Sequence, residues 1–477
     1  MGGGAALGAA VPPARPPSPS PSPLPAGGGG VSFAALDSGI LGPLFATEAM
    51  RAAFADAAFS AAMLKAEAAL ARAEARVGLV PDALAGAIEA AGPPDPAELG
   101  PRTAVSGVPV IPFVKAVQAR LPKDLEPGFH KGATTQDIAD TALALRLREA
   151  FALLETDLAA TIDGLARLAS SHRETPCVAR TYGQHAAPTT FGLKAALWAL
   201  GLTEVLSDLP AVREAMLAAS LAGPVGNLAA LGEAGPAVLD GFAAELGLRA
   251  DAAAWHTRRA RVARTGAWIG LLTGALAKLA VDVAHLASTE VGEVAEPFVP
   301  GRGGSSAMPH KRNPVSATVI IAAHAAAKGP IATLYEAMAG AHERPAGLWH
   351  AEWHALPQLF GLASGALREA RALAEGLTVD TERMRQNLDL TRGLLFADAA
   401  AGRLGAALGR GAAHDLVERA AGLVREQSRH LRDVLASLPE TAGLDLAPAF
   451  DLAPAIRASA LWADRALAEI DRARRST

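Results

Sequence analysis

The chain has 477 residues, of which 51% are hydrophobic, 19% are charged and only 4% are aromatic. An apolar fraction made mainly of alanine and leucine favours packed helices over strands, so we expect an all-α protein of several domains. A net charge of −4 without a long basic run argues against a nucleic-acid or anionic-membrane partner. Cys177 is the only cysteine, which excludes an intrachain disulfide and a cysteine-based metal site and is typical of the reducing cytoplasm.

The chain begins with a segment of low complexity. Residues 1–30 hold eight prolines and eight glycines but a single charge, at Arg15, so we expect a disordered tail outside the fold. Short helical patterns interrupted by prolines follow over residues 31–135. This part of the sequence predicts an N-terminal helical domain.

A long helical pattern follows over residues 136–172, where apolar residues recur every three or four positions. Thr134 and Asp137 have the spacing of a capping pair at its start. Further long patterns cover 188–221, 259–296, 314–341 and 352–376. The sequence therefore predicts a central long-helix bundle domain over 136–377 and a C-terminal helical domain over 378–477.

Several of these long helices are rich in alanine and apolar nearly all round. The bundle of one chain would leave such helices partly uncovered, so we expect bundles from several subunits to pack together. Two uncharged stretches resemble membrane spans, but residues 215–232 are interrupted by Gly223 and Pro224, and residues 265–277 run into Lys278. We therefore expect a soluble protein without a membrane partner.

The most specific motif is the loop over residues 301–314. Its glycines precede Ser305 and Ser306 and give the backbone freedom to close on a ligand, while Lys311 and Asn313 add donors for negative charge. The alternative is an ordinary surface loop; a phosphate-binding loop is excluded because no glycine directly precedes Lys311. The whole string Gly-Ser-Ser-x-Met-Pro-x-Lys-x-Asn-Pro resembles the signature of the fumarase/aspartase/argininosuccinate lyase superfamily.

A second motif, residues 130–137, lies where the first long helix is expected to begin. Hydroxyls and free backbone N–H groups at a helix N-terminus suit a carboxylate, although an ordinary N-cap would have the same residues. The segment resembles the superfamily motif His-x-Gly-x-Thr-Ser-x-Asp, with Thr135 in the Ser position. Lys131 departs from the aromatic residue expected there, and either adds a cation near the site or points to water.

A third motif, residues 180–192, resembles the superfamily string Arg-Thr-His-Gly-x-x-Ala-x-Pro-Thr-Thr-Phe-Gly. Tyr182 stands where lyases of the adenylosuccinate type carry the histidine that protonates a nitrogen leaving group. A nitrogen group leaves poorly without a proton, whereas a carboxylate, with an acid pKa of about 4, departs unassisted. Tyr182 therefore favours a reaction in which a carboxylate is added or lost.

A fourth segment, residues 342–354, has two histidines that would share a helix face. His350 and His354 do not form the zinc motif H-E-x-x-H because Glu352 is two positions after the first histidine, so we expect no metal site. The alternative interpretation is a helix start that carries two tryptophans into the core. The string resembles a segment of 3-carboxy-cis,cis-muconate cycloisomerases, in which Arg344 would bind a carboxylate through two hydrogen bonds.

The resemblance covers the chain from about residue 31 to its end. It implies a three-domain homotetramer with a 20-helix core, active sites assembled from three subunits, no cofactor and a small tricarboxylate substrate. The implied reaction closes a carboxylate of 3-carboxy-cis,cis-muconate onto a double bond to give 4-carboxymuconolactone, in the protocatechuate branch of the β-ketoadipate pathway. Two alternatives stay open: a lyase of the adenylosuccinate type that releases fumarate, and a helical structural protein that reuses the scaffold.

The resemblance also implies the roles of site residues. Ser305 would be the acid and base, with Ser306 as the second choice, while His130 and His185 would either polarise a carboxylate or orient a neighbour. The residues expected to hold the three substrate carboxylates are Thr134, Thr135, Gln136, Thr181, Gln184, Lys311, Asn313 and Arg344.

Overall fold

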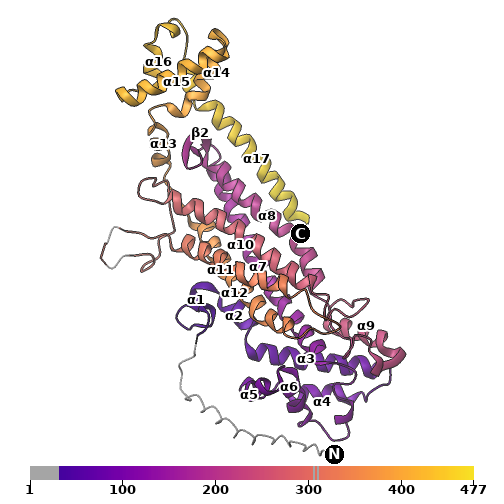
Figure 1. Cartoon of the computed structure of the whole chain (residues 1–477). Coiled ribbons are helices and arrows are strands. Elements are labelled where there is room, and N and C mark those ends of the chain that lie inside the picture. The colour runs from indigo at the N-terminus through magenta and orange to yellow at the C-terminus, as the bar shows by residue number, and fades with distance from the viewer. Residues whose placement is uncertain (1–31, 305–306, 309–310, 477) are drawn as a thin grey trace, which may run out of the picture.

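The computed structural model describes residues 32–304, 307–308 and 311–476. Over these residues the chain is helical, and its strands form two small two-stranded sheets. Figure 1 shows an elongated molecule in which a central bundle of long helices separates a smaller group of helices at each end. The expected all-α class is confirmed. The expected tail, residues 1–30, lies outside the described residues.

Five long helices form the central bundle, as the sequence predicts. They are α7 (Thr135–Ser171), α8 (Phe191–Met216), α10 (Ala260–Leu286), α11 (Val315–Glu336) and α12 (Leu348–Gly376). The largest difference from expectation is at the end of α10, which stops at Leu286, ten residues before the predicted end; the chain then turns through Gly292, whose φ is +63°. α8 and α11 each end five residues before the predicted end, and α8 begins at Phe191 because the residues before it form a strand.

The bundle core is built from the apolar positions that the helical pattern predicts on α7. Leu147, Phe151, Leu154 and Leu158 are buried, and Phe151 contacts both Trp268 of α10 and Phe360 of α12 edge to face. The helices α8, α10 and α11 are long and apolar enough, by length and composition, to cross a membrane. Only between a third and about half of the residues in their apolar windows are buried in one chain, so these helices have apolar faces that the chain leaves uncovered.

One end of the bundle carries a group of shorter helices around α3. They are α1 (Gly42–Phe45), α2 (Glu48–Ala53), α3 (Asp56–Arg76), α4 (Ala83–Ala91), α5 (Pro96–Ser106), α6 (Val110–Gln118) and α9 (Gly235–Leu246). α3 packs against both α7 and α9, and a second apolar core includes residues of all three. The N-terminal segment thus shares its core with the start of α7, and the boundary expected at residues 135–136 stays a prediction.

The other end holds the C-terminal helices. They are α13 (Thr381–Asp389), α14 (Ala397–Leu408), α15 (Arg410–Gln427), α16 (Leu431–Ala436) and α17 (Ala453–Ser476). A separate apolar core joins α14, α15 and α16. α17 then returns along α8, so that the end of the chain lies beside the bundle (Figure 1).

The third motif forms a β-hairpin rather than an irregular connection. β1 (Pro176–Thr181) pairs antiparallel with β2 (Gln184–Thr190), and the two-residue loop between them is Tyr182 and Gly183, with φ of +49° and +77°. Positive φ at both loop residues is the type I′ geometry that matches the twist of a hairpin. The second sheet pairs β3 (Val294–Ala295) with β4 (Thr378–Val379).

Candidate active site

The second motif begins at the N-terminus of α7, and Asp137 fixes it there. Its carboxylate accepts hydrogen bonds from Thr134 N at 2.9 Å, from Ala222 N at 3.0 Å and from Gly223 N at 2.9 Å. It also lies 2.7 Å from His256 Nε2. The fully buried Asp137 therefore caps the helix, as predicted, and ties the motif to a loop almost 90 residues later.

Two of the four motifs meet beside this helix start. The Arg344 guanidinium donates from Nη1 to Thr134 Oγ1 at 2.9 Å and from Nη2 to Thr135 Oγ1 at 2.8 Å. Within the described part of the chain Arg344 has no carboxylate within ion-pairing distance, so its charge is left for a ligand. A half-buried guanidinium, two hydroxyls and a helix N-terminus form a cradle for a carboxylate. We call these three residues the carboxylate cradle.

His130, just before the cradle, is held by a residue that the sequence analysis missed. Its Nδ1 lies 2.6 Å from Oε1 of Glu67 on α3. Burial alone would lower the pKa of His130, but the charge and the hydrogen bond of Glu67, with smaller effects of the Asp137 and Glu74 charges, together outweigh burial and raise that pKa. The neighbouring half-buried Lys131 donates to Leu79 O at 3.0 Å, so its ammonium is held by the segment between α3 and α4.

Gln136 lies inside the protein and makes its contacts there. Its amide donates to His256 O at 3.0 Å and to Asp140 Oδ2 at 3.3 Å. Asp140 in turn pairs with the buried Arg259, which also pairs with Glu352 of α12. Gln136 thus belongs to a buried polar network behind the cradle, and its expected contact with substrate stays a prediction.

The hairpin presents another set of expected site residues. Thr181, Gln184 and the wholly exposed Tyr182 lie at its tip, whereas His185 is half-buried. Burial, and then the neighbouring Arg180 cation, lower the pKa of His185, which therefore is a neutral imidazole at neutral pH. Its Nδ1 is buried and has no hydrogen-bond partner among the described residues.

Arg180 is fixed from below the hairpin by a carboxylate. Its guanidinium donates to Glu293 Oε1 at 2.6 Å and to Oε2 at 3.2 Å, and Asn387 Nδ2 donates to the same carboxylate at 2.8 Å. Glu293 is fully buried. The arginine of this motif therefore anchors the hairpin and is not an exposed cation.

Ser305 and Ser306 of the loop motif lie outside the described residues. At the base of the loop, Asn313 N donates to Gly303 O at 2.9 Å, and a Cβ on Gly303, whose φ is +68°, would be 2.7 Å from Asn313 O. Only glycine allows this approach. Lys311 and Asn313 are exposed and line a cavity of about 280 Å³ together with Glu296, Arg302 and Phe298.

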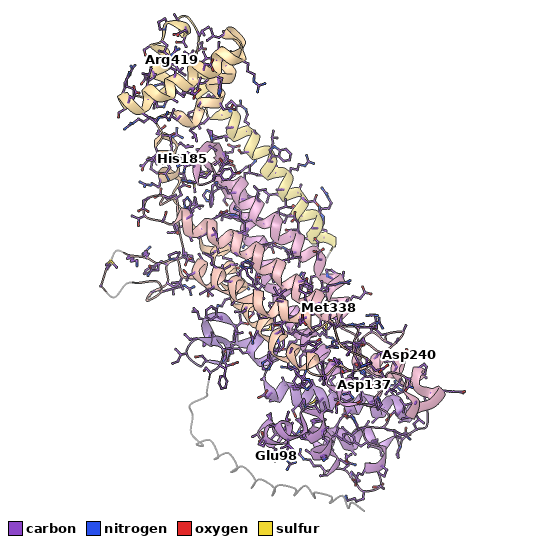
Figure 2. All side chains as sticks on the ribbon, viewed as in Figure 1. Glu98, Asp137, His185, Asp240, Met338 and Arg419 are labelled. Atoms are coloured by element: carbon purple, nitrogen blue, oxygen red, sulfur yellow. The ribbon has the colours of Figure 1, made fainter. Side chains whose placement is uncertain are left out.

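These motif segments do not form one site within a single chain. The cradle lies at the first residues of α7 and the hairpin follows its last ones, so a helix of 37 residues, about 55 Å, separates them. Figure 2 shows the same separation, with Asp137 and His185 near opposite ends of the bundle. The described residues at the base of the loop motif, 301–304 and 311–314, lie at the side of the bundle between them (Figure 1). Among the described site residues, side chains of two different motifs therefore meet only in the cradle of Thr134, Thr135 and Arg344.

The fourth motif leads into α12, which gives the helix start of the alternative interpretation but carries only one of its two tryptophans into the core. Trp349 is buried and donates to Asp140 Oδ1 at 3.1 Å, while Trp353 is partly exposed. His350 Nε2 lies 3.1 Å from Gly107 O, and Glu352 is bound to Arg259. Among the described residues, no group of three or more His, Cys, Asp or Glu side chains converges as metal ligands would.

Comparisons with known proteins agree with this arrangement. A family model described as a lyase matches residues 109–329. The chain is 45% identical to a 3-carboxy-cis,cis-muconate cycloisomerase of Pseudomonas aeruginosa, over 89% of this chain and 95% of the relative. It is 44% identical to a nitrosuccinate lyase of Streptomyces davaonensis, over 85% of this chain and 89% of the relative.

A solved structure shares the fold over nearly its whole length. The crystal structure of the 3-carboxy-cis,cis-muconate lactonizing enzyme from Pseudomonas putida superposes with a TM-score of 0.86 at 43% identity, covering 90% of this chain and 98% of that one. Identity at this level over most of both chains shows common descent as well as a common fold. The chain therefore belongs to the lyase family that includes the 3-carboxy-cis,cis-muconate cycloisomerases.

Proposed function

We propose that this protein is a cytoplasmic 3-carboxy-cis,cis-muconate cycloisomerase, which forms 4-carboxymuconolactone in the protocatechuate branch of the β-ketoadipate pathway. Relatives with that name from three bacteria are each 45% identical over more than four-fifths of this chain. The observation that carries the proposal is the carboxylate cradle, in which a guanidinium without a carboxylate partner among the described residues joins two hydroxyls at a helix start. A tricarboxylate supplies the anion that this cradle lacks.

The chemistry requires negative charge to be stabilised. In the reverse direction a base removes the proton α to a carboxylate, charge builds on that carboxylate, and the lactone oxygen leaves. The proton is weakly acidic, so most of the rate must come from donors aimed at the developing charge. We assign one carboxylate to the cradle, and the others to Lys311 and Asn313 of the loop and to Thr181 and Gln184 of the hairpin.

The acid and base in this assignment is Ser305, with Ser306 as the second choice. The described residues at the two ends of the loop support this role. A hydrogen bond from Asn313 N to Gly303 O holds these ends together, and the Lys311 cation is exposed beside a cavity. A serine held among backbone N–H groups and a cation is more acidic than in water. His185, as a neutral imidazole, would orient or polarise a substrate carboxylate.

The site we propose is shared between subunits of a homotetramer. The cradle and the hairpin lie at opposite ends of α7, so one chain offers each of them an incomplete site. Exposed apolar residues on α8 and α10, namely Leu197, Leu271 and Val281, give neighbouring chains a surface to cover. Antiparallel packing of α7 from two chains would bring a cradle beside a hairpin.

One relative supports a second candidate function. The 44% identity to a nitrosuccinate lyase is close to that of the cycloisomerases. An elimination from nitrosuccinate would expel nitrite, a stable anion that leaves without a proton. Tyr182 in place of a proton-donating histidine is compatible with both reactions, and it weighs against adenylosuccinate, whose nitrogen leaving group needs a proton.

The test is an ultraviolet assay of the purified protein with 3-carboxy-cis,cis-muconate, which follows the loss of the conjugated diene. Nitrosuccinate and adenylosuccinate are run in parallel. We expect rapid loss of the diene and no turnover of the other two compounds. Turnover of nitrosuccinate with an unchanged diene would transfer the assignment to the second candidate, and turnover of adenylosuccinate would refute the leaving-group argument from Tyr182.

A further inference from the structure

We propose that Glu67 is a positioning residue, which holds His130 as a charged donor and leaves its Nε2–H to bind a carboxylate of the substrate. The inference rests on the proposed function, because it assigns His130 a role in binding a tricarboxylate. It assigns a role to Glu67, a buried carboxylate on α3 that lies outside the four sequence motifs.

The contact between the two side chains is short and enclosed. Nδ1 of His130 lies 2.6 Å from Oε1 of Glu67, whose side chain is 1% exposed, while the imidazole is 18% exposed. The other oxygen of this carboxylate, Oε2, is buried without a hydrogen-bond partner among the described residues. A buried carboxylate needs a cation nearby, and an imidazolium supplies one. The same contact makes Nδ1 the donor and leaves Nε2 for a ligand.

The charged groups around the pair are Glu74 of the same helix, Lys131 and Asp137. Lys131 is bonded to Leu79 O, and Asp137 is bonded to backbone N–H groups and to His256. Burial, and then the charge of Glu67, raise the pKa of Glu74 to about 8. Below that pH Glu74 is neutral, so of the two glutamates only Glu67 forms an ion pair with His130.

The backbone supports a functional reading of this contact. His130 has a φ of +58°, in the left-handed region that a residue with a side chain rarely adopts. Gly132 follows with a φ of +69°, and a Cβ there would be 2.6 Å from the Leu231 side chain. Strained residues of this kind concentrate where a side chain has to be aimed.

The diagnostic variant is Glu67→Gln, which keeps a hydrogen-bond acceptor for Nδ1 but removes the negative charge. Glu67 raises the pKa of His130, so the variant lowers it and the imidazolium is lost at a lower pH. If the imidazolium binds substrate, kcat/KM falls as pH rises through the pKa of His130. This fall of kcat/KM, the alkaline limb of the pH profile, should therefore occur at a pH about one unit lower in the variant.

The experiment compares the full-length wild type, Glu67→Gln and a matched control, Glu74→Gln. The control removes an equally buried glutamate from the same helix, and its amide resembles the neutral acid present below pH 8. Titration of ¹⁵N-labelled histidines by NMR, with His130 identified by its absence in His130→Gln, measures the pKa without substrate. The pH profile of kcat/KM with 3-carboxy-cis,cis-muconate then shows whether the His130 imidazolium contributes to substrate binding.

We expect the NMR pKa of His130 and the alkaline limb to move together in Glu67→Gln and to stay in place in Glu74→Gln below pH 7.5. An unchanged NMR pKa in Glu67→Gln overturns the pairing. A shifted NMR pKa with an unmoved limb overturns the role in substrate binding. A wild type that is inactive on this substrate refutes the proposed function instead, while the NMR titration still decides the pairing.

His130→Gln keeps the inference testable if Glu67→Gln does not fold, and a double variant adds a test if it does. His130→Gln should abolish the alkaline limb, since it removes the group that titrates. The double variant with Gln at both positions should lose no more kcat/KM than His130→Gln alone, because Glu67 acts only through His130. A limb that persists in His130→Gln, or a further tenfold loss in the double variant, contradicts the proposal.

Discussion

Arg344 is the residue on which the carboxylate cradle depends, because it alone contacts both hydroxyls of the α7 start. Arg344→Lys keeps the charge but cannot form two parallel hydrogen bonds with a carboxylate. We expect KM for 3-carboxy-cis,cis-muconate to rise by about tenfold and kcat to change less, since the cradle binds substrate and transition state alike. Steady-state ultraviolet kinetics measure both. Arg371→Lys on α12, where the arginine pairs with Asp157 and Glu375, is the control, and an equal KM in the two variants would contradict the cradle.

Ser305 is the residue that we assign as the acid and base. Ser305→Ala should lower kcat by about 100-fold or more, while the Kd for substrate stays near that of the wild type, because the hydroxyl acts in the transition state. Isothermal titration calorimetry with the variant gives the Kd, and the diene assay gives kcat. Ser306→Ala is the matched control, one position along the same loop. Near-normal turnover in Ser305→Ala together with collapse in Ser306→Ala would exchange the two roles.

At the residue level, the sequence motifs indicate some of the side chains that lie together, but not the buried partners that hold them. Thr134, Thr135 and Arg344, from two separate motifs, are expected from the sequence among the residues that hold the three carboxylates. The structure places their side chains in contact, and their role in binding stays a prediction. Glu67 was missed, since a lone glutamate in an alanine-rich helix has the pattern of a solvent-facing charge. Its signal was the apolar residues on both sides, which predict a buried turn of helix.

At the level of elements, the five long helices were predictable because their apolar period extends over many turns. The hairpin was not, because β1 and β2 are short and their sequence lacks the alternation of a half-buried strand. The detectable signal was Gly183 directly after Tyr182, a pair that suits a two-residue turn with positive φ. The hairpin places Tyr182 at an exposed tip.

The buried guanidinium of Arg259 connects three of the long helices. At the start of α10, it pairs with Asp140 of α7 at 2.7 Å and with Glu352 of α12. Arg259→Met leaves two buried carboxylates without a cation, so we expect a loss of about 3–5 kcal/mol in the free energy of unfolding. Urea denaturation followed by circular dichroism measures it. Lys123→Met, in an ion pair whose lysine is 89% exposed, should cost less than about 1 kcal/mol, and equal losses would contradict the argument.

On the scale of the whole molecule, the uncovered apolar faces of the bundle support the proposed tetramer. Leu271 on α10 is 58% exposed in one chain, in a helix that is apolar enough to cross a membrane. We expect analytical ultracentrifugation to give four times the 48.5 kDa of one chain. Leu271→Glu should shift the mass toward smaller species and reduce activity, because a buried unpaired charge opposes assembly. A monomeric, active wild type would contradict a shared site.

The separation of the motifs along α7 makes a stronger prediction about the assembled enzyme. If a site takes its cradle from one chain and its serine loop from another, a loop variant and a cradle variant should restore each other at a substrate concentration far below KM, where both turn over slowly. Co-expressed in equal amounts, Ser305→Ala and Arg344→Ala chains should form mixed tetramers in which about a quarter of the sites combine an intact loop with an intact cradle. The diene assay on the purified mixture should then recover roughly that fraction of wild-type kcat/KM, whereas separately purified variants that are mixed without subunit exchange show only the mean of their own values. Failure of the co-expressed mixture, with tetramers containing both chains confirmed by mass spectrometry, would mean that cradle and loop act within one chain.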